Sequence, residues 1–461
     1  MMKNKAMRCV WLVCGLLMLA VTSCKDDLLY TDGEPIPEGE TTIIAQVDFR
    51  PLVEGLAGKS RTAGDAIKSI QDLCVLLYDT EGNFVEGHSL ESISNANPTD
   101  GQFYVNEVTR KDGDAPDGGT IAETKTPQAN LKLTIPYGRY YIYAVANMGE
   151  DFKKAVQAHG KENGAAEEVA KYKTAIATKE GLKSISLTWD VADVAKNSQM
   201  FGHFTIVGQE NNSELITINK KGMKLHSWIR RAASKVTIAY DGSKLEEGVF
   251  IYLKSVTIKD IPQNCCLGQD NPAVPENYQP KDRDEGVKLD LIKNGETIKY
   301  YEGDTEPTIS DFKETYEARI TKGKPLFGSK EQGENAYHPK KLADVHTEIT
   351  NALYFYENMQ GKGKEGTPSD KRQVVANTLN KTEPTYPNGG QENNEAWKDA
   401  KPYGTYIEVD AFYVSINDKK VGRGPIKYRF MLGKDVITDY NAERNHHYKL
   451  TLKFKGYAND A

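Results

Sequence analysis

The stretch YKLTLKFK at residues 448–455 decides the fold class, because apolar and polar residues alternate through it without a break. Residues 426–432, IKYRFML, show the same alternation, and residues 406–416 form a third segment of this kind. A period of two is that of a β-strand with one face buried. Many short segments with this pattern, separated by turn residues, predict a mostly β protein built from antiparallel β-sandwiches.

Toward the N-terminus, further strand patterns lie at ASKVTIAY (233–240) and VFIYLKSVTI (249–258). The segment AIKSIQDLCVLLYD (66–79) ends in a continuous apolar run with a turn behind it, which predicts a strand buried on both faces. Residues 131–135 and 139–147 predict a hairpin around Pro136-Tyr137-Gly138.

Length and composition fit two sandwich domains. The chain has 461 residues, of which 39% are hydrophobic and 27% charged, so it carries enough apolar material for real cores. The net charge of −6, with no basic block, argues against nucleic acid as the main partner. The expected organisation is a leader at 1–23, a tether at 24–40, an N-terminal β-sandwich at 41–225 with short helices within 151–180, and a C-terminal β-sandwich at 226–461.

The first 24 residues predict a lipoprotein signal peptide. Basic residues precede the apolar stretch 9–21, whose 13 residues are too few to cross a bilayer core of about 30 Å at about 1.5 Å per residue. Small residues precede Cys24 in LAVTSC, which resembles a bacterial lipobox, where the thiol is acylated, for example with palmitate. An ordinary signal peptide with an incidental cysteine is the alternative. We expect a lipid-anchored precursor in the outer membrane.

The segment TTIIAQVDF at 41–49 predicts the first strand of the mature chain. Five of its residues share one face: Thr41, Ile43, Ala45, Val47 and Phe49. Residues 54–65 are small and polar and predict an exposed loop, which is where proteases cut. Arg61, followed by Thr62, is the arginine of that loop.

No motif specifies catalysis or a metal site. The sequence GKGKEG at 361–366 matches a dinucleotide-binding pattern of glycines, but TPSD follows it where a helix is needed. His446 and His447 are neighbours, so in a strand they point to opposite faces, which favours strand-entry residues over a metal site. We therefore predict that the chain is not an enzyme and uses no cofactor and no metal.

Taken together, these motifs resemble those of the fimbrillin-type subunits of the type V pilus of Bacteroidetes. The resemblance covers nearly the whole chain. Besides the leader, the first strand and the exposed arginine, it is carried in order by AIKSIQDLCVLLYD (66–79), YIYAVANMG (141–149), RRAASKVTI (230–238), ALYFYENMQG (352–361) and ERNHHYKLTLKFKGYAND (443–460).

The resemblance implies two tandem antiparallel β-sandwiches of transthyretin-like, Greek-key type, and assembly by strand exchange. Carried onto this chain, Cys24 is a temporary anchor and Arg61-Thr62 is the bond cut by an Arg-specific surface protease. Cleavage removes the strand 41–49, and a strand of another fimbrial subunit fills the groove. The product is then a structural or adhesive subunit of a cell-surface fimbrium. Polymerising members of the family carry an additional C-terminal donor segment, whereas only 456–461 follow the last predicted strand, which slightly favours a tip or accessory position.

Two other interpretations remain open. The chain is either a pilus anchor that is never cut, or a permanently lipidated surface protein that binds glycans or host proteins. Residues 25–61 discriminate between them and the processed subunit, which must lose these residues. The long polar segments 93–130 and 360–402 are candidates for contact with a host or bacterial surface ligand in either case.

Overall fold

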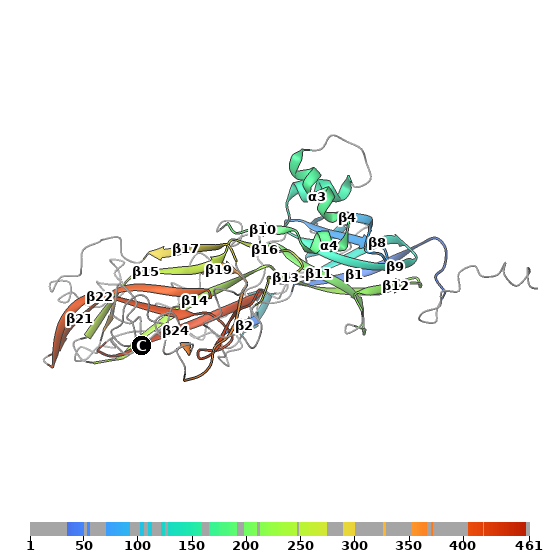
Figure 1. The fold of residues 1–461 in the computed structure, drawn as a ribbon. Helices are drawn as coiled ribbons and strands as arrows, with labels where there is room; N and C mark the ends of the chain where they lie inside the picture. The colour runs from blue at the N-terminus through green and yellow to red at the C-terminus, as the bar shows by residue number, and fades with distance from the viewer. Residues whose placement is uncertain are drawn as a thin grey trace, which may run out of the picture.

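Strands dominate the chain, as the alternating patterns predict. The structure is a computed structural model, and it describes residues 35–49, 53–55, 71–92, 102–105, 109–112, 121–124, 128–158, 166–190, 198–209, 213–246, 249–273, 289–299, 326–328, 352–366, 370–371, 404–417 and 419–457. The strands gather into two lobes along one long axis, with the helices on one side of the N-terminal lobe (Figure 1).

The N-terminal lobe is one sheet that curves round a single core. Its strand order is β11-β13-β1-β8-β5-β4-β3-β9-β12, and β9 also pairs with β11, so the sheet returns to its starting edge. The bounds are β1 Glu40–Phe49, β3 Leu73–Tyr78, β4 Phe84–Ser92, β5 Gln102–Val105, β8 Gln128–Pro136, β9 Gly138–Ala146, β11 Met200–Ile206, β12 Leu215–Ile218 and β13 Lys224–Arg231. Strands β6 (Thr109–Asp112) and β7 (Ile121–Thr124) form a separate pair.

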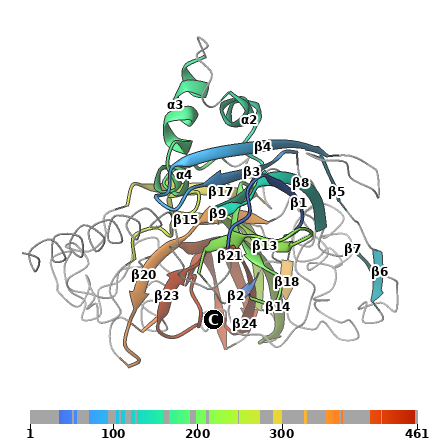
Figure 2. The ribbon, with the colours of Figure 1, turned by 90° about the vertical axis from the view of Figure 1, so that its right-hand side faces the viewer.

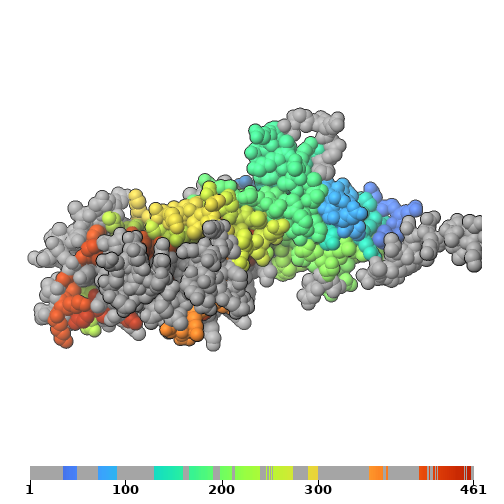
Figure 3. All heavy atoms as spheres, in the orientation of Figure 1, coloured from blue at the N-terminus to red at the C-terminus, as the bar shows by residue number. Residues whose placement is uncertain are grey.

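The central strand β3 is buried along its whole length, as its continuous apolar run predicts. Its alternate residues Leu73, Val75 and Leu77 face the core of the sheet. Cys74, Leu76 and Tyr78 face a second apolar layer, which the helices cover. Those helices are α2 (Glu150–Gln157), α3 (Glu167–Ile176) and α4 (Lys179–Lys183), and Figures 2 and 3 show them as a protrusion on this side of the lobe.

The hairpin predicted at 131–147 is wrong. Strands β8 and β9 follow each other around Tyr137, but β8 pairs with β1 and β5 whereas β9 pairs with β3, β11 and β12. Both strands carry a fully apolar face that enters the same core, so they pack face to face rather than edge to edge. The edge of β8 is thereby left for β1.

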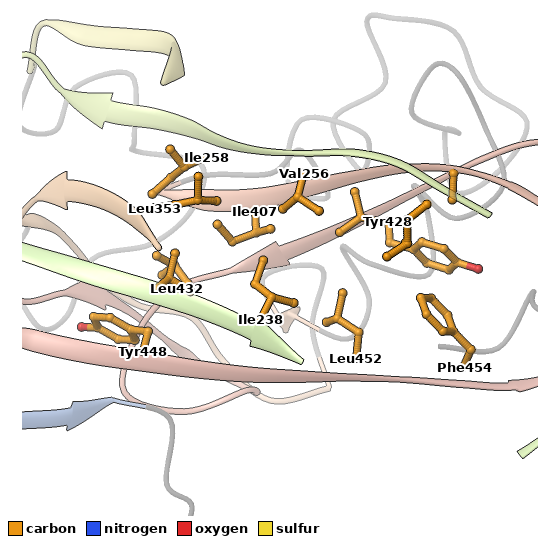
Figure 4. Packing of buried hydrophobic residues seen from close by; sticks show 14 of the residues in the cluster. Ile238, Val256, Ile258, Leu353, Ile407, Tyr428, Leu432, Tyr448, Leu452 and Phe454 are labelled. Carbon is orange, nitrogen blue, oxygen red and sulfur yellow. The ribbon is translucent and has the colours of Figure 1, made fainter. Parts of the chain in front are cut away.

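The C-terminal lobe is a two-layer sandwich. One layer has the order β19-β14-β24-β2, and the other has the order β17-β15-β21-β22, with β18 also on β15. Their bounds are β2 Val53–Gly55, β14 Ala233–Leu245, β15 Val249–Pro262, β17 Leu291–Lys299, β18 Leu326–Gly328, β19 Leu353–Tyr356, β21 Tyr406–Asn417, β22 Lys420–Met431 and β24 His446–Gly456. The alternating apolar residues of both layers meet between them, for example Ile238 and Leu452 opposite Ile407 (Figure 4). Strands β20 (Asn358–Lys362) and β23 (Asp439–Ala442) pair beside this sandwich.

The chain passes from the first lobe to the second at Ala232. Residues 226–231 belong to β13 and pair with β11, so the change of sheet lies after the expected division at 225. A short sheet of β10 (Ser186–Thr188) and β16 (Asn264–Cys266) joins the two lobes. The apolar layer under the helices continues into Tyr354 and Tyr356 of β19, so the lobes share packed side chains.

Parallel pairs occur within sheets that the patterns predict to be antiparallel. They are β1 with β13, β4 with β5, β14 with β24, and β2 with β24. Side-chain alternation is the same in parallel and antiparallel strands, so the sequence pattern could not distinguish them. In the described part of the chain, no helix has the length and apolar character needed to span a membrane.

Candidate strand-exchange site

The first strand of the described chain, β1, lies in the interior of its sheet. Strand β1 pairs antiparallel with β8, from Glu40 opposite Pro136 to Asp48 opposite Gln128. On its other side it pairs in parallel with β13, from Ile44 opposite Lys224 to Phe49 opposite Ile229. An interior strand has both rows of backbone groups hydrogen-bonded, so β1 holds two neighbours together.

The inward face of β1 is part of the hydrophobic core. Ile43, Ala45 and Val47 are each 0% exposed and pack in the core cluster of the lobe. Thr41 is also buried, and its hydroxyl has no hydrogen-bond partner among the residues that the structure describes. Four of the five residues predicted to share one face therefore do so; for Phe49 the structure describes the backbone alone.

The outward face of β1 carries a hydrogen-bonded aspartate–histidine pair that the sequence patterns do not reveal. The Nε2 atom of His226 on β13 lies 2.7 Å from Oδ2 of Asp48, and both side chains are nearly buried. The amide of Gln46 donates to the same carboxylate oxygen at 3.2 Å. The ring of Trp228 packs edge-on against His226, with the ring centroids 5.0 Å apart. A polar residue on the outer face of a strand gives no signal of its partner across the sheet, so sequence reasoning missed this pair.

The same segment supplies a strand to the second lobe. After β1, residues 53–55 form β2, which pairs in parallel with His446–Tyr448 of β24 (Figure 1). Sequence reasoning placed Glu54 and Gly55 in the loop 54–65, and the structure corrects this start. A parallel edge strand needs only backbone groups, so small and polar residues can form it.

The remaining predicted site residues are Cys24, Arg61 and Thr62, and they lie outside the described residues. His446 and His447 are placed at the start of β24, as predicted. They contact different partners: His446 Nδ1 is 2.7 Å from the carbonyl oxygen of Arg444, and His447 Nε2 is 2.8 Å from the Thr237 hydroxyl. Within the described ranges, no cluster of three or more His, Cys, Asp or Glu residues could hold a metal ion.

One hollow of about 260 Å³ opens on the outer side of the second lobe. It is lined by Lys254, Asp410, Ala411, Phe412, Pro425, Ile426 and Lys427. The carboxylate in it, Asp410, forms an ion pair with Lys427 at 3.4 Å.

Comparison with known proteins matches this β-rich architecture to surface proteins. A model of a domain of unknown function, DUF4906, matches residues 353–452, and no curated protein matches the chain. A candidate cell adhesion protein from Parabacteroides distasonis is 10% identical, with 91% of this chain and 89% of that chain covered and a TM-score of 0.40. One from Bacteroides eggerthii is 13% identical, with 92% and 89% covered and a TM-score of 0.36.

The tip fimbrial protein Mfa3 from Porphyromonas gingivalis is also similar, at 10% identity, with 90% of this chain and 94% of that chain covered and a TM-score of 0.35. Fimbrial and adhesion proteins of Bacteroidetes are therefore among the structural neighbours, as the sequence motifs predict. At these TM-scores the likeness supports no functional conclusion, so function is inferred from the geometry of β1.

Proposed function

We propose that this chain is a structural or adhesive subunit of a cell-surface fimbrium, assembled by removal of β1 and insertion of a strand from another subunit. The observation that carries the proposal is topological. Strand β1 comes first in the described chain but lies in the interior of its sheet. A single cut between β2 and β3 frees it, and the chain from Leu73 onward keeps every other strand of that sheet.

The energetics favour refilling the slot. Loss of β1 leaves the facing edges of β8 and β13 with unpaired backbone groups, beside an apolar cleft that held Ile43, Ala45 and Val47. An extended segment from another chain restores the hydrogen bonds and the apolar contacts together, which is β-augmentation. Because the donor and the slot are different surfaces, the contact is head-to-tail and extends into a fibre.

The maturation steps follow the sequence motifs. Cys24 carries the lipid that holds the precursor on the outer membrane, and an Arg-specific surface protease cuts the bond between Arg61 and Thr62. The segment released holds both β1 and β2. Within the fimbrium we assign the chain a tip or accessory position, with other fimbrial subunits as partners and the long polar segments 93–130 and 360–402 as the candidates for contact with a surface ligand. This role requires no catalysis by the chain.

Limited proteolysis of the chain from Lys25 onward tests the proposal. An Arg-specific protease should cut first after Arg61 and leave a stable fragment that begins at Thr62, read by intact mass and N-terminal sequencing. That fragment should take up a synthetic peptide of residues 40–55. The variant Arg61→Gln is the control and should keep the segment that holds β1, because Arg50, the other arginine between Lys25 and β3, precedes Pro51, which hinders cleavage.

Resistance of the natural chain at Arg61, with β1 retained and no peptide uptake, would contradict the proposal. A pilus anchor or a permanently lipidated binding protein would then be the better account.

A further inference from the structure

We propose that His226 selects the incoming strand by an acidic residue at the place of Asp48, and that this pair sets the register of the strand in the slot. The inference rests on the proposed function, because it names the chemistry of the partner that fills the slot. The partner is an extended segment of another subunit with apolar residues on one face, a small residue at the place of Ala45 and a carboxylate three residues later.

The apolar row alone leaves the register incompletely defined. Ile43, Ala45 and Val47 alternate with outward residues, so a slip by one residue would turn the apolar face to solvent. A slip by two residues keeps every apolar side chain on the correct face. A feature that occurs at only one position along the strand must therefore exclude the slip by two residues.

The Asp48–His226 pair is such a feature. Its side chains are 10% and 13% exposed, and the two atoms are 2.7 Å apart. Trp228 covers one side of the imidazole, and the hydroxyl of Thr205 donates to the backbone carbonyl of His226 at 3.3 Å. Because solvent is largely excluded, this hydrogen bond to a carboxylate is stronger and more directional than one at the surface.

A slip by two residues removes this interaction in either direction. It brings Gln46 or Arg50 to the place of Asp48, so the histidine faces an amide or a cation instead of a carboxylate. The same slip puts Ile43 or Val47 at the place of Ala45, which is 0% exposed. A branched side chain there overpacks the core. The hydrogen bond between Asp48 and His226 and the small pocket at Ala45 thus select the same register.

Peptide exchange on the cleaved full chain from Lys25 tests this inference. Labelled peptides of residues 40–55 are exchanged into the slot, and their affinity is measured by fluorescence anisotropy. The peptide variant Asp48→Asn keeps the shape and removes the charge, and it should bind about tenfold more weakly. The matched control is Thr42→Ala, which alters an outward contact with Thr134 and leaves Asp48 in place.

Two further readouts separate a register effect from a general loss of fit. On a chain with His226→Gln, the Asp48→Asn peptide should bind within about twofold of the natural peptide, because the partner of the charge is gone. A photoreactive residue at position 44 should label the region of Lys224, its register partner, and should label positions two residues away when Asp48 is replaced.

Each outcome is decisive. Equal affinity of the natural and Asp48→Asn peptides on the natural chain, with the same labelling pattern, overturns the inference and leaves strand exchange standing. Uptake of no peptide at all, with β1 retained after cleavage, overturns the proposed function and the inference with it. The peptide variants require no change in the protein, so the test holds even if His226→Gln fails to fold.

Discussion

Replacing Ile43 by Ala tests how far the core of the N-terminal lobe depends on β1. Ile43 is 0% exposed and lies opposite Leu133 of β8. The next residue, Ile44, has the same chemistry but is 49% exposed on the other face of the strand. The variant Ile44→Ala is therefore a control matched in residue type, strand and backbone position.

The expected cost follows from the carbon atoms removed. Ile→Ala deletes three carbons, and at about 0.8 kcal/mol for each buried CH₂ the lost transfer free energy is about 2.4 kcal/mol. The cavity left behind adds to this, because the surrounding strands relax only in part, so Ile43→Ala should lower the free energy of unfolding by about 3–4 kcal/mol. Ile44→Ala should cost about 1 kcal/mol, because half of its surface already faces water and its loss leaves no buried cavity.

Urea unfolding of the chain from Lys25 measures both values, with Trp189→Phe and Trp397→Phe in every variant so that the fluorescence of Trp228 is the probe of this lobe. Trp228 lies on β13, next to β1, and is half-exposed. The slope of the transition must be the same in all variants for the comparison to hold. Equal losses of unfolding free energy for Ile43→Ala and Ile44→Ala would refute the reasoning, because β1 would then stabilise the lobe through its backbone hydrogen bonds and not through its apolar face.

Three further predictions concern the rest of the fold. Burial, with the nearby charges of Lys235 and others, lowers the pKa of His447 to about 3. As the pH falls, the unfolded chain is therefore protonated at this residue before the folded chain, and the free energy of unfolding should decrease below about pH 6.5, by about 2 kcal/mol at pH 5. His447→Gln should flatten this decrease in urea unfolding. Arg444 and Glu357 form a buried ion pair, so Glu357→Gln, which leaves the cation unpaired, should lower the free energy of unfolding by about 3–5 kcal/mol. The double variant Arg444→Met with Glu357→Leu leaves no unpaired charge and should lose less, and an equal or larger loss would contradict this. Gly202→Ala should lower the melting temperature markedly, since a Cβ there would meet a β13 carbonyl oxygen at 2.4 Å; an unchanged melting temperature would show that β13 can move.

The elements predicted best are those whose pattern depends on burial alone. Alternation in YKLTLKFK and the apolar run before Tyr78 correspond to β24 and β3. The pairing of strands was predicted poorly, as the wrong hairpin of β8 with β9 shows. The apolar face of a strand does not indicate whether the next strand pairs with it in the same sheet or packs against it across the core.

The same limit applies to the candidate site. The inward row of β1 could be predicted from the two-residue period, and it was confirmed at Ile43, Ala45 and Val47. Asp48 and His226 are separated by 178 residues, and each alone looks like an ordinary polar residue in a strand. Strand β2 escaped prediction because an edge strand needs no apolar pattern.

The segment 40–55 connects the two lobes in addition to the passage at Ala232 and the short sheet of β10 and β16. It is continuous in the chain and places β1 in one lobe and β2 in the other. Strands of the C-terminal lobe run along the long axis (Figure 1), so tension along that axis loads their hydrogen bonds in shear, many at once, and not one after another. A segment that pairs in both lobes shares this tension with the other connections between them. If a strand of a neighbouring subunit replaced this segment, the hydrogen bonds between the subunits would carry part of the tension that acts along the fibre.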